Sequence, residues 1–443
     1  MQSTLRPESV LTKLQRVAEI SGKAPEMVWT TLAHNIDILL LKEAYRLTRK
    51  NGAAGVDGQT AIGYEENLEE NLQSLLDRFK SGTYKAPPVR RTYVPKGDGK
   101  KMRPIGIPTF EDKVLQRAVA MVLNAVYEQD FLECSYGFRP RRSAHQAIDE
   151  LWKIAMKPGV SVVLELDIEK CFDVLDHGHM RSFLDQRVRD GVIRKAIDKW
   201  LKAGVMEEGV VYHPETGTPQ GGVVSPILMN IYLHEVLDSW FEQVVKPRLA
   251  GEAHLIRYAD DATFVFHSKA DVAKVMDVLP KRFGRFGLNL HSEKTRQIDF
   301  KRPGSGDRKS QSGCFDFLGF THYWARSRSG NWIVKRKTAR DRFTRSLKCI
   351  ELWCRVNRHL PVSEQCITLS RKLRGHVQYY YIRGNSFAIG RFYHEVYARW
   401  RKWLNRRSQR ARMTWERFTN LRKIYPLIKP KMLALNHVAR PKL

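Results

Sequence analysis

The sequence has no apolar run long enough to cross a membrane. A spanning helix needs about 18 or more apolar residues in succession, and no segment approaches that length. The charged, amphipathic stretch 1–20 lacks the apolar core of a secretion signal. There is also no internal repeat and no low-complexity block. These absences exclude membrane-spanning, secreted and repeat proteins and lead us to expect a cytoplasmic one.

Cysteine is scarce and shows no pattern. The 6 cysteines form no CxxC pair, and none has a histidine at zinc-ligand spacing. The sequence therefore provides no structural zinc site and no disulfide framework. It is typical of a cytosolic protein whose thiols are reduced and mostly buried.

Acidic residues are scarce in the last quarter of the chain. Residues 321–443 contain 30 Lys/Arg and 5 Asp/Glu, a net charge of +25, whereas residues 1–300 contain 42 and 40. Such a surplus repels itself unless a polyanion neutralises it. An acidic membrane surface is the alternative partner, but the basic residues are spread among Trp and Tyr and form no single amphipathic anchor. We therefore predict a nucleic-acid partner and no membrane.

The remaining composition is ordinary, with 42% apolar and 28% charged residues, and 443 residues leave room for two or three domains. Apolar spacing predicts helices over 27–50, 63–80, 110–126, 178–204, 225–245 and 270–286, and beyond 338. β-Branched runs and turn residues predict strands over 85–96, 159–166, 210–212, 297–299 and 315–320, and a hairpin around 254–266. This order predicts an α+β core followed by a separate basic helical module.

The most informative motif is the acidic pair Asp260-Asp261, between two mainly apolar runs. In a turn, both carboxylates can converge on one cation, and Mg²⁺ prefers oxygen ligands. On its own, however, the dipeptide is more often a solvated turn.

A third carboxylate, Asp167, follows the β-branched run 159–166. A strand-ending aspartate in a turn is common, but from a sheet edge this side chain can emerge beside the hairpin. Together Asp167, Asp260 and Asp261 predict a site for two Mg²⁺ ions, which stabilise the attacking and leaving oxygens of a phosphoryl transfer when about 4 Å apart.

Several segments resemble, in order and spacing, the motifs of reverse transcriptases, and most of all those encoded by bacterial group II introns. The palm motifs are DIEKCFDVLDH (167–177), TPQGGVVSPILMNIYLHEVLD (218–238) and RYADD (257–261). Finger-like segments are 94–119 and 135–148, and later palm-like segments are 287–295 and 315–320. LRGHVQYY (373–380) and WLNRRSQ (403–409) resemble the maturase, or X, region.

The resemblance covers roughly residues 40–425 and implies a right-hand polymerase. Residues 1–155 would form an N-terminal extension and fingers, 156–330 the palm with part of the fingers, and 331–443 a basic helical thumb and maturase region. Some family members continue into an HNH endonuclease, and the resemblance places this chain among the forms without one, in the bacterial cytosol.

The resemblance also implies nucleotide contacts. Lys96 and Arg103 would clamp the β- and γ-phosphates, or they are solvated charges of the fingers. Phe172 would stack under the sugar and exclude a 2′-hydroxyl, or it is a core residue. Gln220 and Gly221 match the nucleotide-contacting motif, where a glycine lets the backbone approach the nucleotide. Lys294 would shield or protonate the pyrophosphate, or it is a surface lysine.

Primer and RNA contacts follow in the same way. Tyr258 resembles the residue beneath the primer terminus. The primer grip would be Phe317, Leu318 and Gly319, although an apolar strand alone predicts only packing. The candidate RNA contacts in the basic module are Arg374, Arg406, Arg407 and Arg410, whereas we expect most of its aromatic residues to be core.

The chain departs from the family pattern at two places. Lys170-Cys171 replaces a frequent Gly-Phe, which could alter contacts near the ribose, and Ala262 replaces a frequent Phe, which we interpret as a packing change.

The leading hypothesis is therefore an RNA-directed DNA polymerase that uses two Mg²⁺ ions, dNTPs and a DNA primer on an RNA template. It would also bind its own intron RNA to promote splicing and insertion into target DNA. The alternatives are an RNA-binding splicing cofactor without polymerase activity, and a reverse transcriptase used for host defence or diversity generation.

Overall fold

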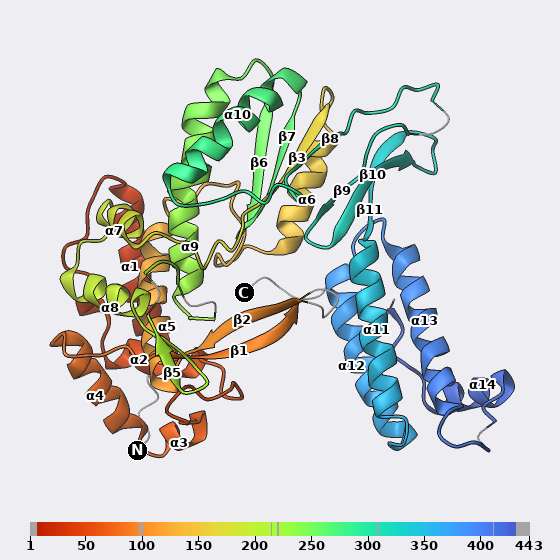
Figure 1. Cartoon of the computed structure of the whole chain (residues 1–443), viewed down its shortest axis with the longest axis horizontal. Coiled ribbons are helices and arrows are strands. Elements are labelled where there is room, and N and C mark those ends of the chain that lie inside the picture. The colour runs from red at the N-terminus through yellow and green to blue at the C-terminus, as the bar shows by residue number, and fades with distance from the viewer. Residues whose placement is uncertain are drawn as a thin grey trace. The chain divides into compact units, whose positions relative to one another are not determined.

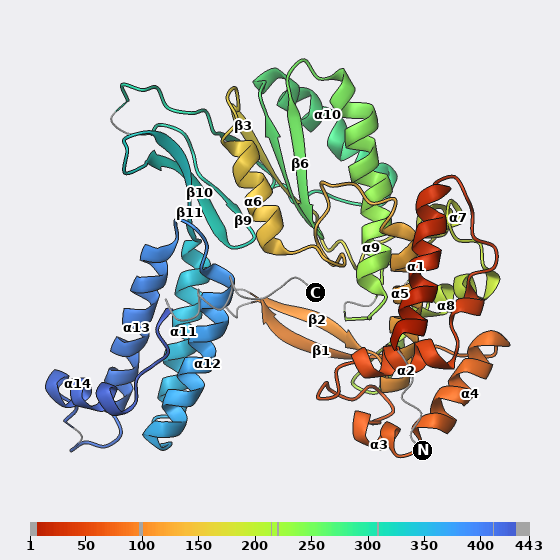
Figure 2. The same ribbon diagram turned by 180° about the vertical axis from the view of Figure 1, so that it is seen from behind.

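The computed structural model describes residues 7–96, 101–213, 215–218, 221–307, 310–410 and 412–430. By its internal contacts the chain divides into two compact units, Met1–Asp299 and Phe300–Leu443, and each is described by itself. The division into fingers, palm and thumb stays a prediction. Figures 1 and 2 show the elements from opposite sides.

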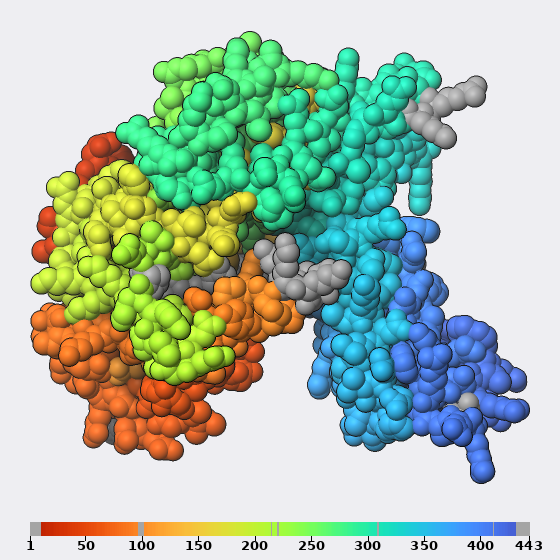
Figure 3. Space-filling view, in the orientation of Figure 1, coloured from red at the N-terminus to blue at the C-terminus, as the bar shows by residue number. Residues whose placement is uncertain are grey.

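The first unit contains a helical region and a four-stranded sheet. Its first helices are α1 (Pro7–Lys23), α2 (Ile38–Leu47), α3 (Ala61–Glu65), α4 (Leu68–Lys80) and α5 (Phe110–Tyr127). The sheet has the order β2-β1-β4-β5 and consists of β1 (Val89–Lys96), β2 (Lys101–Ile107), β4 (Val205–Glu207) and β5 (Val210–Tyr212). Helix α5 is buried along most of its length and packs against α1 and α2. Strand β5 is an edge strand with exposed side chains, and Figure 3 shows it at the surface.

A second sheet in this unit has the order β6-β7-β3-β8, and all its pairs are antiparallel. Its strands are β3 (Val162–Asp167), β6 (Ala253–Tyr258), β7 (Asp261–Phe266) and β8 (Arg296–Asp299). Strand β3 is buried from Val162 to Leu166 because it lies inside the sheet and helices cover it. Helix α6 (Ala144–Ala155) packs against β6, and α10 (Lys269–Arg285) packs against β3 and β7.

The other helices of the unit are α7 (His177–Asp185), α8 (Gly191–Leu201) and α9 (Ser225–Leu233). Beyond α9 the chain stays helical with π-type turns at His234–Asp238 and Phe241–Val245. The predicted helix 225–245 is thus confirmed in extent but not in regularity. Val224 occupies the N-cap position of α9, and Pro226 lies in its first turn.

The single helix predicted over 27–50 is wrong. A short 3-10 turn (Ala33–Asn35) and α2 replace it. The Asp190 carboxylate accepts from Leu32 N and Ala33 N, at 2.6 and 2.8 Å, and Asp37 caps α2 by accepting from Leu40 N. Side-chain acceptors thus take backbone donors that a continuous helix would use.

The second unit begins with a sheet of order β11-β10-β9 and continues into helices. Its strands are β9 (Phe315–Phe317), β10 (Phe320–Arg326) and β11 (Trp332–Thr338), and its helices are α11 (Arg340–Val356), α12 (Val362–Tyr380), α13 (Ser386–Leu404) and α14 (Trp415–Ile424). Leu347, Leu369, Phe392, Trp400 and Phe418 share one core among these helices. Trp400 and Phe418 are therefore core, whereas Trp415 is exposed and Trp353 and Trp403 are half-buried.

The structure bears on the predictions about membrane spans and about thiols. In the part of the chain that it describes, each helix is too short or too polar to cross a bilayer. All six cysteines are free, but only Cys171 and Cys354 are buried, while Cys314 and Cys349 are exposed. The expectation of mostly buried thiols is therefore wrong for this chain.

Candidate active site

The three candidate metal ligands come from neighbouring strands of the second sheet. Strands β3 and β7 are antiparallel, and their register places Asp167 directly opposite Asp261. Directly opposite residues have Cβ atoms about 4.5–5.5 Å apart and point to the same face of the sheet. Strand β6 ends at Tyr258, which pairs with Asp261 at the start of β7. Asp260 is the second residue of the two-residue turn between them. The backbone thus brings Asp167 beside the hairpin, as the sequence predicts.

A lysine accompanies the acidic group. Lys294 Nζ lies 2.5 Å from Asp167 Oδ2, and the exposed fractions of the two side chains are 52% and 25%. The turn that carries Lys294 is held to the end of β3, because His291 N donates to the Asp167 carbonyl at 2.9 Å. Like charges directly opposite one another on a sheet are destabilising. Lys294 therefore supplies a positive charge where two carboxylates meet.

The donor chemistry fits Mg²⁺, which takes a few carboxylate oxygens from a protein and completes its shell with water and phosphate. Among the described residues, no three His, Cys, Asp or Glu side chains are already arranged as a ligand cluster. Asp167 faces the ammonium group of Lys294 instead. The Asp167 carboxylate thus already has a cationic partner within the protein itself.

Backbone strain is concentrated in the motif segments. Of the six described non-glycine residues with positive φ, five lie in segments that resemble polymerase motifs: Phe138 (57°), Arg141 (61°), Lys170 (46°), Ala259 (58°) and Leu318 (48°). The sixth is Glu208 (49°), which lies outside them. The left-handed region costs a residue with a Cβ roughly 1–2 kcal/mol, and such residues gather at functional sites. Lys170 stands where the family often has glycine, so this departure from the pattern leaves a side chain on a strained turn.

The two predicted nucleotide-contacting segments are joined by hydrogen bonds. Thr218 N donates to the Phe172 carbonyl, and Gly217 N donates to the Leu175 carbonyl, both at 2.7 Å. Gly217 has φ 88°, and a Cβ there would lie 2.6 Å from the Asp173 carbonyl oxygen. Phe172 is half-buried and packs against the core. The structure thus brings the Phe172 turn and the segment leading to Gly221 together, although they are far apart in sequence.

Gly221 also contacts the first sheet. With φ 117°, its Cβ position would lie 2.5 Å from the Gly106 carbonyl oxygen of β2, so only glycine fits there. Strand β2 also carries Arg103, which is exposed. Gln220 and the side chain of Lys96 lie outside the described part of the chain.

Gln116 is a positioning residue that the sequence analysis missed. Its Oε1 accepts from Val223 N at 2.7 Å and from Val224 N at 3.2 Å, while its Nε2 donates to Asp112 at 2.9 Å. Asp112 also accepts from Tyr84 OH and from Trp200 Nε1. Burial raises the pKa of Asp112 to about 6. The available signal was an Asp and a Gln four residues apart on a mainly apolar helix.

The finger-like segment 135–148 lies against the turn Ala259-Asp260. A Cβ on Gly137 would lie only 2.2 Å from Ala259 N. The ring of Phe138, 53% exposed, has its centroid 6.5 Å from that of Tyr258. The half-buried Tyr258 thus has an aromatic neighbour at the surface.

The candidate primer grip lies in the second unit. Phe317 ends β9 and is 4% exposed, and Leu318 and Gly319 form the turn to β10. Tyr379 OH donates to the Leu318 carbonyl at 2.9 Å. This turn is therefore held by α12.

The four candidate RNA contacts differ in their surroundings. Arg374, Arg406 and Arg410 are exposed. Arg407 is half-buried, and its guanidinium donates to the carbonyls of Arg358 and Leu360, at 2.6 and 2.5 Å. Arg407 thus holds the loop between α11 and α12.

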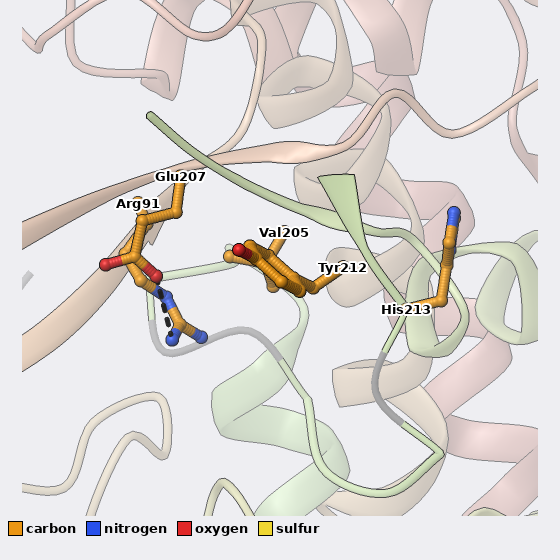
Figure 4. Close-up of a pocket in the computed structure, with 5 residues that line it drawn as sticks. All are labelled: Arg91, Val205, Glu207, Tyr212 and His213. Carbon is orange, nitrogen blue, oxygen red and sulfur yellow. Dashed lines mark ion pairs between the residues drawn. The ribbon is translucent and has the colours of Figure 1, made fainter. Parts of the chain in front are cut away.

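A groove of about 330 Å³ lies on the first sheet (Figure 4). Its lining consists of Arg91, Val205, Glu207, Tyr212 and His213. Arg91 and Glu207 lie side by side and form an ion pair at 3.6 Å. None of the candidate site residues lines this groove.

Comparisons with known proteins agree with this arrangement. Residues 94–322 match the family described as reverse transcriptase (RNA-dependent DNA polymerase). The chain is 38% identical over 230 residues to the group II intron-encoded protein LtrA of Lactococcus lactis subsp. cremoris, covering 50% of this chain and 37% of that protein. It is 37% identical over 225 residues to protein YkfC of Escherichia coli, covering 49% and 58%.

A more distant similarity reaches a plant protein. The chain is 28% identical over 228 residues to nuclear intron maturase 2, mitochondrial, of Arabidopsis thaliana, covering 41% of this chain and 31% of that protein. The matches thus span less than two thirds of each of these relatives. Because the family match covers more than half of its residues, the chain belongs to the reverse transcriptase (RNA-dependent DNA polymerase) family.

Proposed function

We propose that this chain is an RNA-directed DNA polymerase of the group II intron type. The observation that carries the proposal is the register of β3 and β7, which sets Asp167 opposite Asp261 with Asp260 in the adjoining turn. Two carboxylate-bearing strands of this kind suit a reaction in which charge develops on both the attacking and the leaving oxygen.

Asp167, Asp260 and Asp261 would hold two Mg²⁺ ions. When bound, these ions would activate the primer 3′-hydroxyl and neutralise the triphosphate. The chain's own residues would position the substrates: Phe172 and Gly221 the incoming dNTP, Tyr258 the primer end, and Arg103 the phosphates. Lys294 would move from Asp167 to the pyrophosphate, whose negative charge attracts an ammonium group.

The same chain would bind its own intron RNA in the bacterial cytosol, promoting splicing and insertion into target DNA. Support comes from the net charge of +25 over residues 321–443, and from the exposure of Arg374, Arg406 and Arg410 on the second unit. The similarity to a group II intron-encoded protein and to an intron maturase points to the same partner. Recognition would depend on RNA shape and phosphates more than on base edges.

Primer extension on an RNA template with Mg²⁺ and dNTPs tests the proposal. Wild type should extend the primer, and Asp260→Ala should not, although both should bind the RNA with equal affinity. If wild type extends no primer, the polymerase proposal is wrong. If it nevertheless promotes splicing of the intron RNA, the splicing cofactor without polymerase activity takes its place.

A further inference from the structure

A fully buried arginine lies directly behind the catalytic turn. Arg257 precedes Tyr258 on β6, and its side chain and that of Asp238 are both 0% exposed. Arg257 Nε donates to Asp238 Oδ1 at 2.7 Å, and Nη2 donates to Asp238 Oδ2 at 2.5 Å. The pair therefore has the two-pronged geometry that gives an arginine–carboxylate contact its directionality.

The remaining donors of Arg257 reach the motif segments. Nη1 donates to Ala259 O at 3.0 Å and to Asn230 Oδ1 at 3.1 Å, and Nη2 also donates to Ser135 Oγ at 2.8 Å. A guanidinium has five N–H groups in a fixed plane. These five contacts therefore use every donor, and the guanidinium has one orientation in which all are satisfied.

The bond to Ala259 O is the one that bears on catalysis. Ala259 is the first residue of the turn and has φ 58°, and its carbonyl belongs to the peptide that continues into Asp260. A strained conformation persists only where its surroundings hold it. Arg257 holds this peptide from inside the protein, while the candidate metal ligands are on the accessible side.

The other partners tie the turn to two separate segments. Asn230 on α9 accepts from Arg257 and donates through Nδ2 to Gly137 O at 2.8 Å. Asp238 ends the π-type turn that follows α9, a kind of distortion that occurs frequently at functional sites. The network thus joins the turn, the 135–138 segment and the helix after Gly221.

A buried ion pair is a poor way to gain stability. Removing two charges from water costs several kcal/mol per ion, and well-packed apolar residues of similar volume often stabilise a protein as well or better. An apolar pair in place of Arg257 and Asp238 could not make the directional hydrogen bonds that Arg257 makes to the turn and to the neighbouring segments. We propose that Arg257, held by Asp238, is a positioning residue that fixes the Ala259-Asp260 peptide, and with it the carboxylates of Asp260 and Asp261. This inference rests on the proposed polymerase function.

The first unit offers a matched control. Arg187 forms an ion pair with Asp130 at 2.8 Å, with exposed fractions of only 8% and 16%. Its guanidinium donates to backbone carbonyls in the segment 21–27. Arg187 thus has the same chemistry as Arg257, but its partners lie outside the motif segments.

Arg257→Lys keeps the charge and loses the planar fork, and Arg187→Lys makes the same change at the control pair. Both variants should lower the melting temperature. Misplacing catalytic groups by about 1 Å can cost about 100-fold in rate, so Arg257→Lys alone should lower kcat about 10- to 100-fold and raise the Mg²⁺ concentration for half-maximal rate. Its dissociation constant for primer–template should equal that of wild type.

A second readout needs no metal and no substrate. In the metal-free protein, amide hydrogen exchange at residues 259–261 should be faster in Arg257→Lys than in wild type and unchanged in Arg187→Lys. If kcat falls by the same factor in Arg257→Lys and Arg187→Lys, Arg257 has only a structural role. The same follows if amide exchange in the turn of Arg257→Lys stays at the wild-type rate. An inactive wild type would overturn the proposed function instead, while the exchange result would still decide how the turn is held.

Should Arg257→Lys not fold, Ser135→Ala is the milder variant. It removes one acceptor from the guanidinium and leaves the Asp238 ion pair in place. We expect faster exchange at 259–261 and a several-fold lower kcat. Wild-type values for both quantities would contradict the inference.

Discussion

Asp167 and Asp261 face each other directly across the antiparallel strands β3 and β7. Their charges repel, and Lys294, which pairs with Asp167, is the cation that reduces this repulsion in the protein itself. If Asp167 holds Mg²⁺ as we propose, the incoming ion would compete with this ammonium group. Lys294 would then stabilise the metal-free state and weaken metal binding.

Lys294→Met tests this competition. Without metal, the variant should melt slightly lower than wild type, since an ion pair as exposed as this contributes at most about 1 kcal/mol. Mg²⁺ should raise its melting temperature more than that of wild type, because no lysine has to be displaced. Lys269→Met is the control, since Lys269 is an exposed lysine that pairs with Asp299 outside the site. Equal Mg²⁺-induced shifts in Lys294→Met and wild type would contradict the competition.

Gly137→Ala should abolish primer extension while the protein stays folded. The new Cβ would lie 2.2 Å from Ala259 N, so the turn Ala259-Asp260, which carries a proposed metal ligand, must shift. Gly284→Ala makes the same substitution inside α10, where a Cβ meets nothing within 4 Å. Because alanine favours helix over glycine by up to about 1 kcal/mol, Gly284→Ala should be more stable than wild type and fully active. Normal extension by Gly137→Ala would show that the turn is not held where we describe it.

Asp112 should make stability depend on pH. Its pKa is raised from 3.8 to about 6, chiefly by burial, so the folded state favours the protonated carboxyl. Asp112 therefore contributes its full share to the free energy of unfolding below about pH 4, and this share is lost as the pH rises through about 6. A shift of about two units corresponds to about 3 kcal/mol.

Asp112→Asn removes this titration. The free energy of unfolding of wild type minus that of Asp112→Asn, measured by urea unfolding, should therefore fall between about pH 4 and pH 7 and stay constant above. A difference that stays constant over the whole range would contradict the raised pKa.

The exposed arginines of the second unit should contribute to RNA binding, and the half-buried one to stability. The affinity for RNA falls with salt concentration, and each phosphate contact that is lost makes the plot of log affinity against log salt shallower by about 1. Arg374→Ala and Arg410→Ala should each weaken RNA binding and reduce the slope in this way.

Arg407→Ala should lower the melting temperature, because it frees the carbonyls of Arg358 and Leu360. A melting temperature of Arg407→Ala equal to that of wild type would contradict its role in the loop.

The sequence predicts the parts of the site that local patterns specify. The β-branched run before Asp167 and the hairpin around Asp260-Asp261 are visible as strands, and their convergence follows from strand ends meeting at one edge. The ion pair of Lys294 with Asp167 joins residues 127 positions apart. It depends on the turn after α10, which no periodicity specifies.

Other elements are hidden because buried polar residues break the apolar pattern. Strand β11 buries Trp332, Val334, Arg336 and Thr338 on one face. The charge at Arg336 interrupts the alternation, and no strand was predicted there. Arg257 is similar, since an arginine within a strand gives no sign that its partner Asp238 lies 19 residues earlier, within the helical segment that follows α9. Long-range ion pairs become visible only when the fold brings their segments together.

The most direct test of the central claim locates the metal ions themselves. Fe²⁺ in place of Mg²⁺, with ascorbate and peroxide, generates radicals that cut the backbone close to the bound ion. We expect cuts at the end of β3, near Asp167, and in the turn at 259–261, and we expect Asp260→Ala to abolish both. Cuts elsewhere in wild type, or an unchanged pattern in Asp260→Ala, would contradict a metal site built from Asp167, Asp260 and Asp261.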